Sequence, residues 1–141
     1  MRIGDKVIFR GKIATIYDIS TYSDKIWVEN DEDMYIATSS DIINYVEFKK
    51  DEICRILENE GYIVDEICQD YIEDVEFITV SVETCDYIVY IDINSNDSYD
   101  LCTYNKNLTS KELDEDEDMY KNRRSVKSTK AVKNYVERFD K

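Results

Sequence analysis

The sequence predicts an α+β fold in which a small N-terminal β-barrel, residues 1–48, precedes an acidic αβββα domain with a three-stranded antiparallel sheet, residues 49–141. Three observations support this fold. Short alternating segments, separated by Gly, Asn, Asp and Ser, fill the first third of the chain. A helical stripe and a run rich in β-branched and aromatic residues follow. A second helical stripe ends the chain of 141 residues.

The first 48 residues hold five strand-like segments. In each of them apolar and polar residues alternate, or β-branched and aromatic residues dominate. A flat sheet of this size would leave its apolar face bare, so we expect a small, strongly bent barrel. The five segments are Val7–Arg10, Lys12–Tyr17, Lys25–Glu29, Met34–Thr38 and Ile42–Phe48.

Short motifs in this region resemble the small barrels of the Src-homology-3-like type. They are Gly4-Asp5-Lys6-Val7, the run from Gly11 to Ile16, an aromatic strand and a Ser-Asp-Ile turn. Such barrels occur in bacterial and phage proteins and bind peptides, RNA or other domains. The resemblance therefore implies that the N-terminal part is a binding module.

A helix and its exit are predicted over residues 49–64. Ile53, Ile56 and Leu57 form one apolar stripe at helical spacing. Gly61 is placed to end the helix in a left-handed conformation, after which the chain leaves as an extended piece.

A three-stranded antiparallel meander is predicted over residues 75–104. Its first two segments are β-branched and aromatic, and a short connection joins them. The polar run from Ser95 to Ser98 is a turn by composition. The three strands are Val75–Glu83, Tyr87–Asn94 and Tyr99–Tyr104.

The last part of the chain combines an acidic loop with a basic helix. Residues 105–124 include six acids in seven positions from Glu112 to Asp118, and such dense like charge predicts a mobile, solvated loop. A final helix is expected from about Ser125 to Phe139. Its core stripe consists of Val132, Tyr135, Val136 and Phe139.

The net charge of −14, from 32 acids and 18 bases, is concentrated in the middle of the chain. Residues 51–121 carry 21 acids and 4 bases, net −17, whereas residues 122–141 carry 2 acids and 7 bases, net +5. An acidic surface repels nucleic acid and anionic membranes and attracts basic protein surfaces. The expected partner is therefore a basic protein surface, with no direct nucleic-acid or membrane binding.

Catalysis is not expected. The chain has no histidine, which removes Ser-His and Cys-His nucleophilic chemistry, and only three glycines, with no phosphate-binding loop. The run from Asp92 to Ser98 matches the start of a calcium loop, but Asp97 replaces its glycine, so a hairpin turn is the better interpretation. No cofactor or metal is predicted.

Cysteine spacing and the N-terminus predict a cytoplasmic protein. Cys54, Cys68, Cys85 and Cys102 form no close pair of the kind that binds zinc, and we expect them to be reduced. The N-terminal residues MRIGDKVIFRGK lack the features of a signal peptide. No apolar run approaches the roughly 20 residues that cross a bilayer.

The candidate partner-binding residues are carboxylates, which would imitate phosphates, and tyrosines, which are enriched at interface hot spots. The carboxylates are Asp51, Glu52, Glu58, Glu60, Asp65, Glu66, Asp70, Glu73, Asp74, Glu112, Asp114, Glu115, Asp116, Glu117 and Asp118. The tyrosines are Tyr99, Tyr104 and Tyr120. An internal explanation for the acidity is that the basic C-terminal helix docks against it.

The order of helix, Gly-Tyr-x-Val exit, three-stranded meander, acidic segment and final helix resembles some small acidic anti-CRISPR proteins encoded by phages. The resemblance covers residues 49–139. It implies a DNA mimic that presents carboxylates to the groove of a CRISPR effector nuclease in the cytoplasm of a bacterial host.

Two other classes of binding protein stay open. One is an immunity protein or antitoxin that neutralises a basic toxin, and the other is a phage structural or assembly adaptor whose barrel binds a peptide or subunit. Any of these proteins could also form a homodimer.

Overall fold

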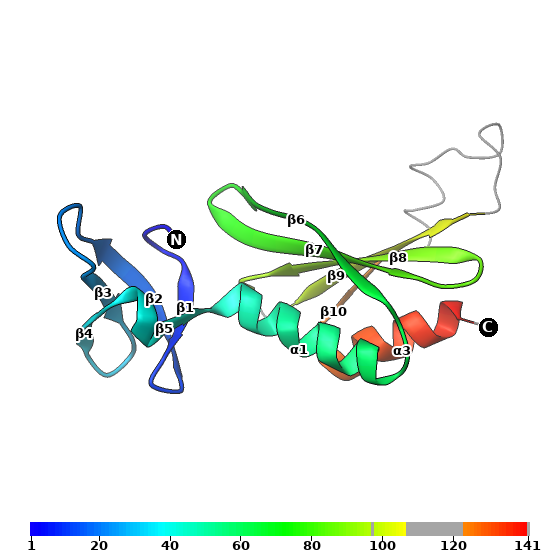
Figure 1. Ribbon diagram of the computed structural model, residues 1–141, viewed down its shortest axis with the longest axis horizontal. Helices are drawn as coiled ribbons and strands as arrows, with labels where there is room; N and C mark the ends of the chain where they lie inside the picture. Colours follow the sequence, from blue (N-terminus) through cyan, green and yellow to red (C-terminus); the bar gives the residue numbers. More distant parts are fainter. Residues whose placement is uncertain (97, 107–122, 141) are drawn as a thin grey trace.

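The computed structural model describes residues 1–96, 98–106 and 123–140, and these form two antiparallel sheets and two α-helices (Figure 1). The first sheet contains β1 (Lys6–Phe9), β2 (Lys12–Ile19), β3 (Ile26–Glu29), β4 (Met34–Ala37) and β5 (Ile42–Asn44). The second contains β6 (Val64–Ile72), β7 (Val75–Glu83), β8 (Tyr87–Asn94), β9 (Tyr99–Asn105) and β10 (Arg124–Val126). The helices are α1 (Tyr45–Asn59) and α3 (Thr129–Phe139), and a 3₁₀ turn covers Ser39–Asp41.

The predicted α+β class is confirmed, but the predicted barrel is wrong. The first sheet has the order β4-β3-β2-β1-β5, so that β4 and β5 are its two outer strands. No pairing joins these two strands within the described residues. Each of the five segments predicted in this region contains a strand, although the fifth is a strand only over Ile42–Asn44, and alternate residues such as Val7 and Phe9 share one buried face.

The first helix begins four residues before the predicted start. The segment Ile42–Phe48, predicted as a strand, stays extended only to Asn44, whose side chain caps the helix by accepting a hydrogen bond of 2.9 Å from the Glu47 amide. The helix ends before Gly61, which has φ 92° and so adopts the left-handed conformation expected there.

The predicted three-stranded sheet is also wrong, because the second sheet has five strands in the order β10-β9-β8-β7-β6. The extra strand β6 pairs with β7 from Val64 opposite Val82 to Ile72 opposite Val75. Glu73 and Asp74 form the two-residue turn between them with φ of 49° and 66°, as a type I′ hairpin requires. The short β10 pairs with β9 and covers the end of the region predicted to be irregular and the predicted start of the final helix, which begins only at Thr129.

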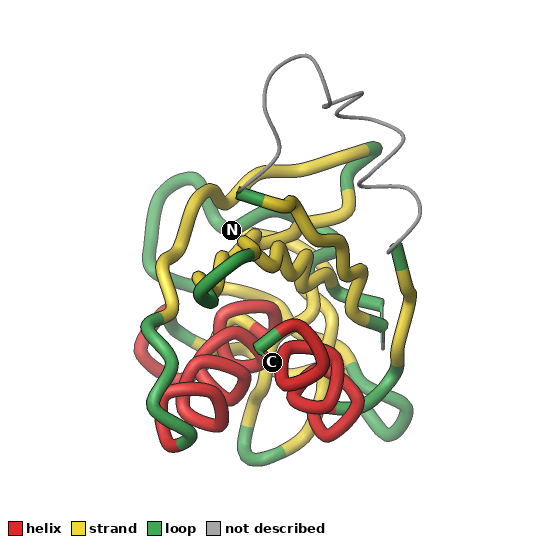
Figure 2. The backbone as a smooth tube through the Cα atoms, turned by 90° about the vertical axis from the view of Figure 1, so that its right-hand side faces the viewer, coloured by secondary structure: helices red, strands yellow, loops and turns green. Residues whose placement is uncertain are grey.

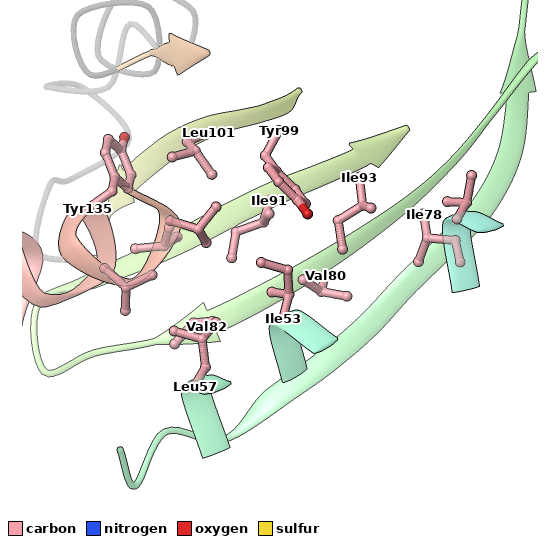
Figure 3. Packing of buried hydrophobic residues seen from close by; sticks show 14 residues of the cluster. Ile53, Leu57, Ile78, Val80, Val82, Ile91, Ile93, Tyr99, Leu101 and Tyr135 are labelled. Carbon is pink, nitrogen blue, oxygen red and sulfur yellow. The ribbon is translucent and has the colours of Figure 1, made fainter. Parts of the chain in front are cut away.

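Both helices cover the same face of the second sheet (Figure 2). Ile53 and Leu57 of α1 pack against inward-facing residues of β7 and β8, among them Val80 and Ile91 (Figure 3). Tyr135 of α3 lies in the same cluster. This cluster shares no residue with the buried cluster of the first sheet, so the protein has two separate cores.

Two lysines connect the first sheet and α1 to the turn that follows β8. Lys49 is only 5% exposed, and its ammonium donates to the carbonyls of Asn94 at 3.1 Å and Asn96 at 2.7 Å. Lys6 on β1 donates to the carbonyl of Ser95 at 2.9 Å. The carbonyls of three consecutive residues, 94 to 96, therefore accept hydrogen bonds from side chains outside the second sheet. Within the described residues, neither helix is long and apolar enough to cross a membrane.

Candidate protein-binding surface

The most exposed strand of the second sheet is β6, which forms one of its outer edges. Six consecutive residues, 65–70, are exposed, whereas the neighbouring β7 alternates between buried and half-buried positions. Side chains on both faces of β6 are therefore exposed, and the helices do not cover them. Together with the following turn it carries five exposed carboxylates, here named the acidic edge. They are Asp65, Glu66, Asp70, Glu73 and Asp74.

The carboxylates of the acidic edge are not engaged in ion pairs within the described residues. The ion pairs found there involve other acids, including Glu32, Asp51, Glu60 and Glu83. No ammonium or guanidinium of the described residues forms an ion pair with these carboxylates, although Lys50 lies near enough to Glu66 to respond to its charge, and the edge is available to a basic partner.

An open groove of about 400 Å³ lies between α1 and β6. Asp51 pairs with Lys50 at 2.9 Å across part of this groove. The pKa of Lys50 is raised, first by this hydrogen bond and further by the charges of Asp51 and Glu66, and burial raises the pKa of the Cys54 thiol. The groove is lined by Lys50, Asp51, Cys54, Arg55, Glu58, Asn59, Val64 and Glu66.

A second open groove, of about 450 Å³, lies where β6 begins. Four carboxylates line it, namely Glu60, Asp65, Glu83 and Asp140. Three of them have partners within the protein. Glu60 pairs with Lys133 and Glu83 with Lys106, both at 2.9 Å, and Asp140 accepts a hydrogen bond of 2.9 Å from the Tyr62 hydroxyl.

The basic C-terminal helix docks in part against the acidic region of the same molecule. Lys133 lies 2.9 Å from Glu60 and 3.8 Å from Glu137, and these charges raise its pKa. Lys127 and Lys130 stay exposed near β10. The second sheet consequently has an acidic outer strand on one side and a basic one on the other.

The structure separates the predicted binding residues into distinct groups. The acids Asp51, Glu52 and Glu58 lie on α1, and all but the half-buried Glu52 are exposed. The prediction for Tyr99 was wrong, because this side chain is 5% exposed and belongs to the second core, beneath the ammonium of Lys49. It points inward with the alternating pattern of β9.

The remaining predicted residues have less exposed or undescribed positions. Tyr104 is half-buried on the face of the second sheet that points away from the helices. Tyr120, the acids from Glu112 to Asp118 and the mobility predicted for residues 105–124 lie largely outside the described residues.

A buried carboxylate cluster at the far end of β6 was not predicted from the sequence. The Tyr71 hydroxyl lies 3.0 Å from a carboxylate oxygen of Asp5 and 3.0 Å from one of Glu76. Both acids are buried, and the Arg2 guanidinium lies 3.6 Å from the centre of the Tyr71 ring. Glu76 therefore does not add to the exposed acidity. Alternation along Val75–Glu83 places it inward and could have indicated its burial.

Two tyrosines of this surface should make stability fall at alkaline pH. Burial, and then the hydrogen bond to Asp140, raises the pKa of Tyr62 to about 12, whereas an unfolded tyrosine titrates near 10. The stability that depends on protonated Tyr62 is thus complete below pH about 10 and is lost as the pH rises to about 12. Burial followed by its two carboxylate contacts raises the pKa of Tyr71 in the same direction.

Thermal unfolding at a series of pH values checks this prediction. We expect the melting temperature to fall between pH about 10 and 12, and to fall less steeply in Tyr62→Phe. Tyr22, which is 99% exposed, supplies the control as Tyr22→Phe, which should keep the slope of the parent protein. Equal slopes in Tyr62→Phe and the parent would contradict the role assigned to Tyr62.

Within the described residues, no group of three or more Cys, Asp or Glu side chains is arranged to hold a metal ion. Comparison with protein families, with curated proteins and with solved structures finds no match to this chain.

Proposed function

We propose that this protein binds, through the acidic edge, the basic groove in which another protein holds nucleic acid, and thereby blocks that groove. The partner class is a nucleic-acid enzyme, with a CRISPR effector nuclease as the instance implied by the sequence resemblance. The observation that supports this most is that five exposed carboxylates lie along β6 and its turn without ion pairs in the described residues. To block a nucleic-acid-binding groove, the protein needs only this charged surface and no catalytic group.

The charge density of the acidic edge can be compared with that of DNA. The nine residues of β6 span about 30 Å at about 3.3 Å per residue. One strand of duplex DNA carries about nine phosphates over that length, since its charges follow each other every 3.4 Å. Three carboxylates of the acidic edge, Asp65, Glu66 and Asp70, lie on β6 itself, so the strand supplies about a third of this density. Further carboxylates on α1, such as Asp51 and Glu58 in the adjoining groove, bring the surface closer to a DNA strand.

The proposal is tested with a panel of guide-loaded CRISPR effectors and a restriction endonuclease. We expect the protein to prevent DNA binding by one of these enzymes, and we expect its inhibition to weaken steeply as salt rises, because exposed charges are screened. Excess DNA added before the protein should protect the enzyme. The readouts are fluorescence-based DNA binding and DNA cleavage at low and moderate salt.

A variant with matched charge identifies the surface responsible. Asp65→Asn, Glu66→Gln and Asp70→Asn together should weaken inhibition about tenfold, at roughly 0.5 kcal/mol for each exposed charge. The control carries Glu29→Gln, Asp31→Asn and Glu47→Gln, three exposed acids away from β6 that change the net charge equally. Equal losses in both variants, inhibition that does not depend on salt, or no inhibition of any enzyme would contradict the proposal.

A further inference from the structure

The outer side of β6 carries main-chain groups that no strand of the described chain pairs with. β6 is the last strand in the order β10-β9-β8-β7-β6 and is hydrogen-bonded only to β7. β6 has nine residues, the same length as its neighbour β7. An outer strand of this length presents alternate N–H and C=O groups that an extended chain can join.

We propose that β6 accepts an extended, basic segment of the partner protein as a sixth strand of the second sheet. This inference rests on the proposed function and deepens it by naming the binding mode. Main-chain hydrogen bonds to β6 would supply affinity, and carboxylates of the acidic edge would select Lys and Arg in the added strand.

The register of the sheet shows where those basic side chains would lie. Asp65 is opposite Ser81 and Asp70 is opposite Phe77, so both acids lie on the face that points away from the helices. A strand added beside β6 would therefore place Lys or Arg on that face, level with these two acids. The bulge between Glu66 and Cys68 interrupts the alternation in the middle of the strand.

A second copy of this chain is a poorer occupant than a basic segment. Antiparallel pairing of β6 with itself around Cys68 would bring Asp65 and Glu66 close to Asp70 of the other copy, and like charges opposite each other destabilise a strand pair. Pairing of β6 with the basic β10 of another copy would match in charge. However, β10 has three residues against the nine of β6, so most of β6 would stay unpaired.

Charged residues on an outer strand can also serve only to prevent aggregation. The apolar residues of this edge argue against that explanation. Ile63, Ile67 and Ile72 are 76%, 52% and 64% exposed, and an edge that only prevented aggregation would not expose three isoleucines beside its acids. Ile63 and Ile67, which lie away from the Tyr71 end of β6, predict that the partner segment interleaves apolar residues with its basic ones.

The free length of the edge is limited at one end. Tyr71 is held by Asp5 and Glu76 and is covered by Arg2, so the N-terminal segment before β1 occupies the end of β6. The residues open to an added strand are therefore 64–70, which are joined by the exposed Ile63 before them.

Amide hydrogen exchange with a synthetic peptide tests strand addition. The probe is a ten-residue peptide that alternates lysine and valine, and its control is the same peptide N-methylated at every residue. The control keeps charges and side chains but has lost its main-chain donors. We expect the unmodified peptide to slow exchange of the outward amides of β6 at least tenfold and to bind the triple Asp65→Asn, Glu66→Gln, Asp70→Asn variant about tenfold more weakly. The methylated peptide should give no protection.

Each contrary outcome has a separate meaning. Equal binding by the methylated peptide would show that charge alone acts, which overturns strand addition and leaves the proposed function standing. Protection of β6 without peptide, with a dimer in sedimentation, would make a second copy the occupant and overturn the inference. No protection by either peptide, while a nuclease is still inhibited through the acidic edge, would also overturn it. If the unmodified peptide protects β6 but no nuclease is inhibited, the proposed function is contradicted while strand addition still stands.

Discussion

Replacement of Lys49 by methionine should lower the free energy of unfolding by about 3 kcal/mol. The ammonium of Lys49 is buried and donates to the carbonyls of Asn94 and Asn96, and it also lies 4.7 Å from the centre of the Tyr99 ring. Each hydrogen bond to a charged group contributes about 1.5–3 kcal/mol, and Lys49 donates two such bonds to partly buried carbonyls. Methionine keeps most of the side-chain volume, so the loss would come mainly from the missing donor.

The neighbouring lysine provides the control for this measurement. Lys50 forms an ion pair with Asp51, whose side chain is 73% exposed, and such surface pairs contribute at most about 1 kcal/mol. Urea unfolding followed by circular dichroism should therefore show a large loss of stability for Lys49→Met and a small one for Lys50→Met. If Lys49→Met unfolds at the same urea concentration as the parent, an apolar side chain replaces the buried charge without cost, as occurs at some buried ion pairs.

The role of Lys49 shows what the sequence could and could not predict about α1. The inward positions of this helix are Val46, Lys49, Ile53 and Leu57, which follow helical spacing. A lysine at one of them looks like a solvated residue, and its carbonyl partners lie 45 and 47 residues away in the chain. Ile42–Phe48, which contains the start of the helix, has five β-branched or aromatic residues out of seven, so propensity favoured a strand where the Asn44 cap begins a helix.

The strands themselves were predicted where alternation is strong and missed where pairing alone defines them. All five strands of the first sheet, and β7, β8 and β9, carry β-branched or alternating residues and were predicted. β6 has three acids and a bulge in nine residues, so its sequence shows neither alternation nor strand propensity. It is extended because a type I′ turn folds it back on β7. Closure of the first sheet into a barrel depends on strand curvature, which residue type did not determine.

The candidate site was predicted in its chemistry and not in its arrangement. Acid-rich composition predicted that Asp65, Glu66 and Asp70 bind a partner, and in the structure all three are exposed on β6. That they share one unpaired outer strand depends on the order of strands in the sheet, which is a long-range property. Burial of Tyr99 follows from its face of β9 and could have been inferred, because its neighbours Leu101 and Thr103 on that face are also buried.

Replacement of Ile91 by alanine should destabilise the second sheet by about 3–4 kcal/mol and leave the first sheet almost unchanged. Ile91 is fully buried in β8 among residues of both helices, and truncation of a buried isoleucine to alanine costs about 2–5 kcal/mol. The buried cluster of the first sheet shares no residue with that of the second. The two cores, with α1 and its Val46 belonging to the second, thus predict that two units unfold separately.

Two probes within the same molecule can follow these units in one urea titration. Trp27, the single tryptophan, lies in β3 and reports on the first sheet, whereas helical circular dichroism arises from α1 and α3, which pack on the second. In Ile91→Ala the midpoint of the helical signal should fall by roughly 2 M urea, while the midpoint of Trp27 fluorescence stays in place. The opposite pattern is expected for Val28→Ala, which truncates the first core. If both signals shift together, the Lys6–Ser95 and Asp5–Tyr71 contacts couple the sheets into one cooperative unit, and β6 would then be held in its place by the whole protein.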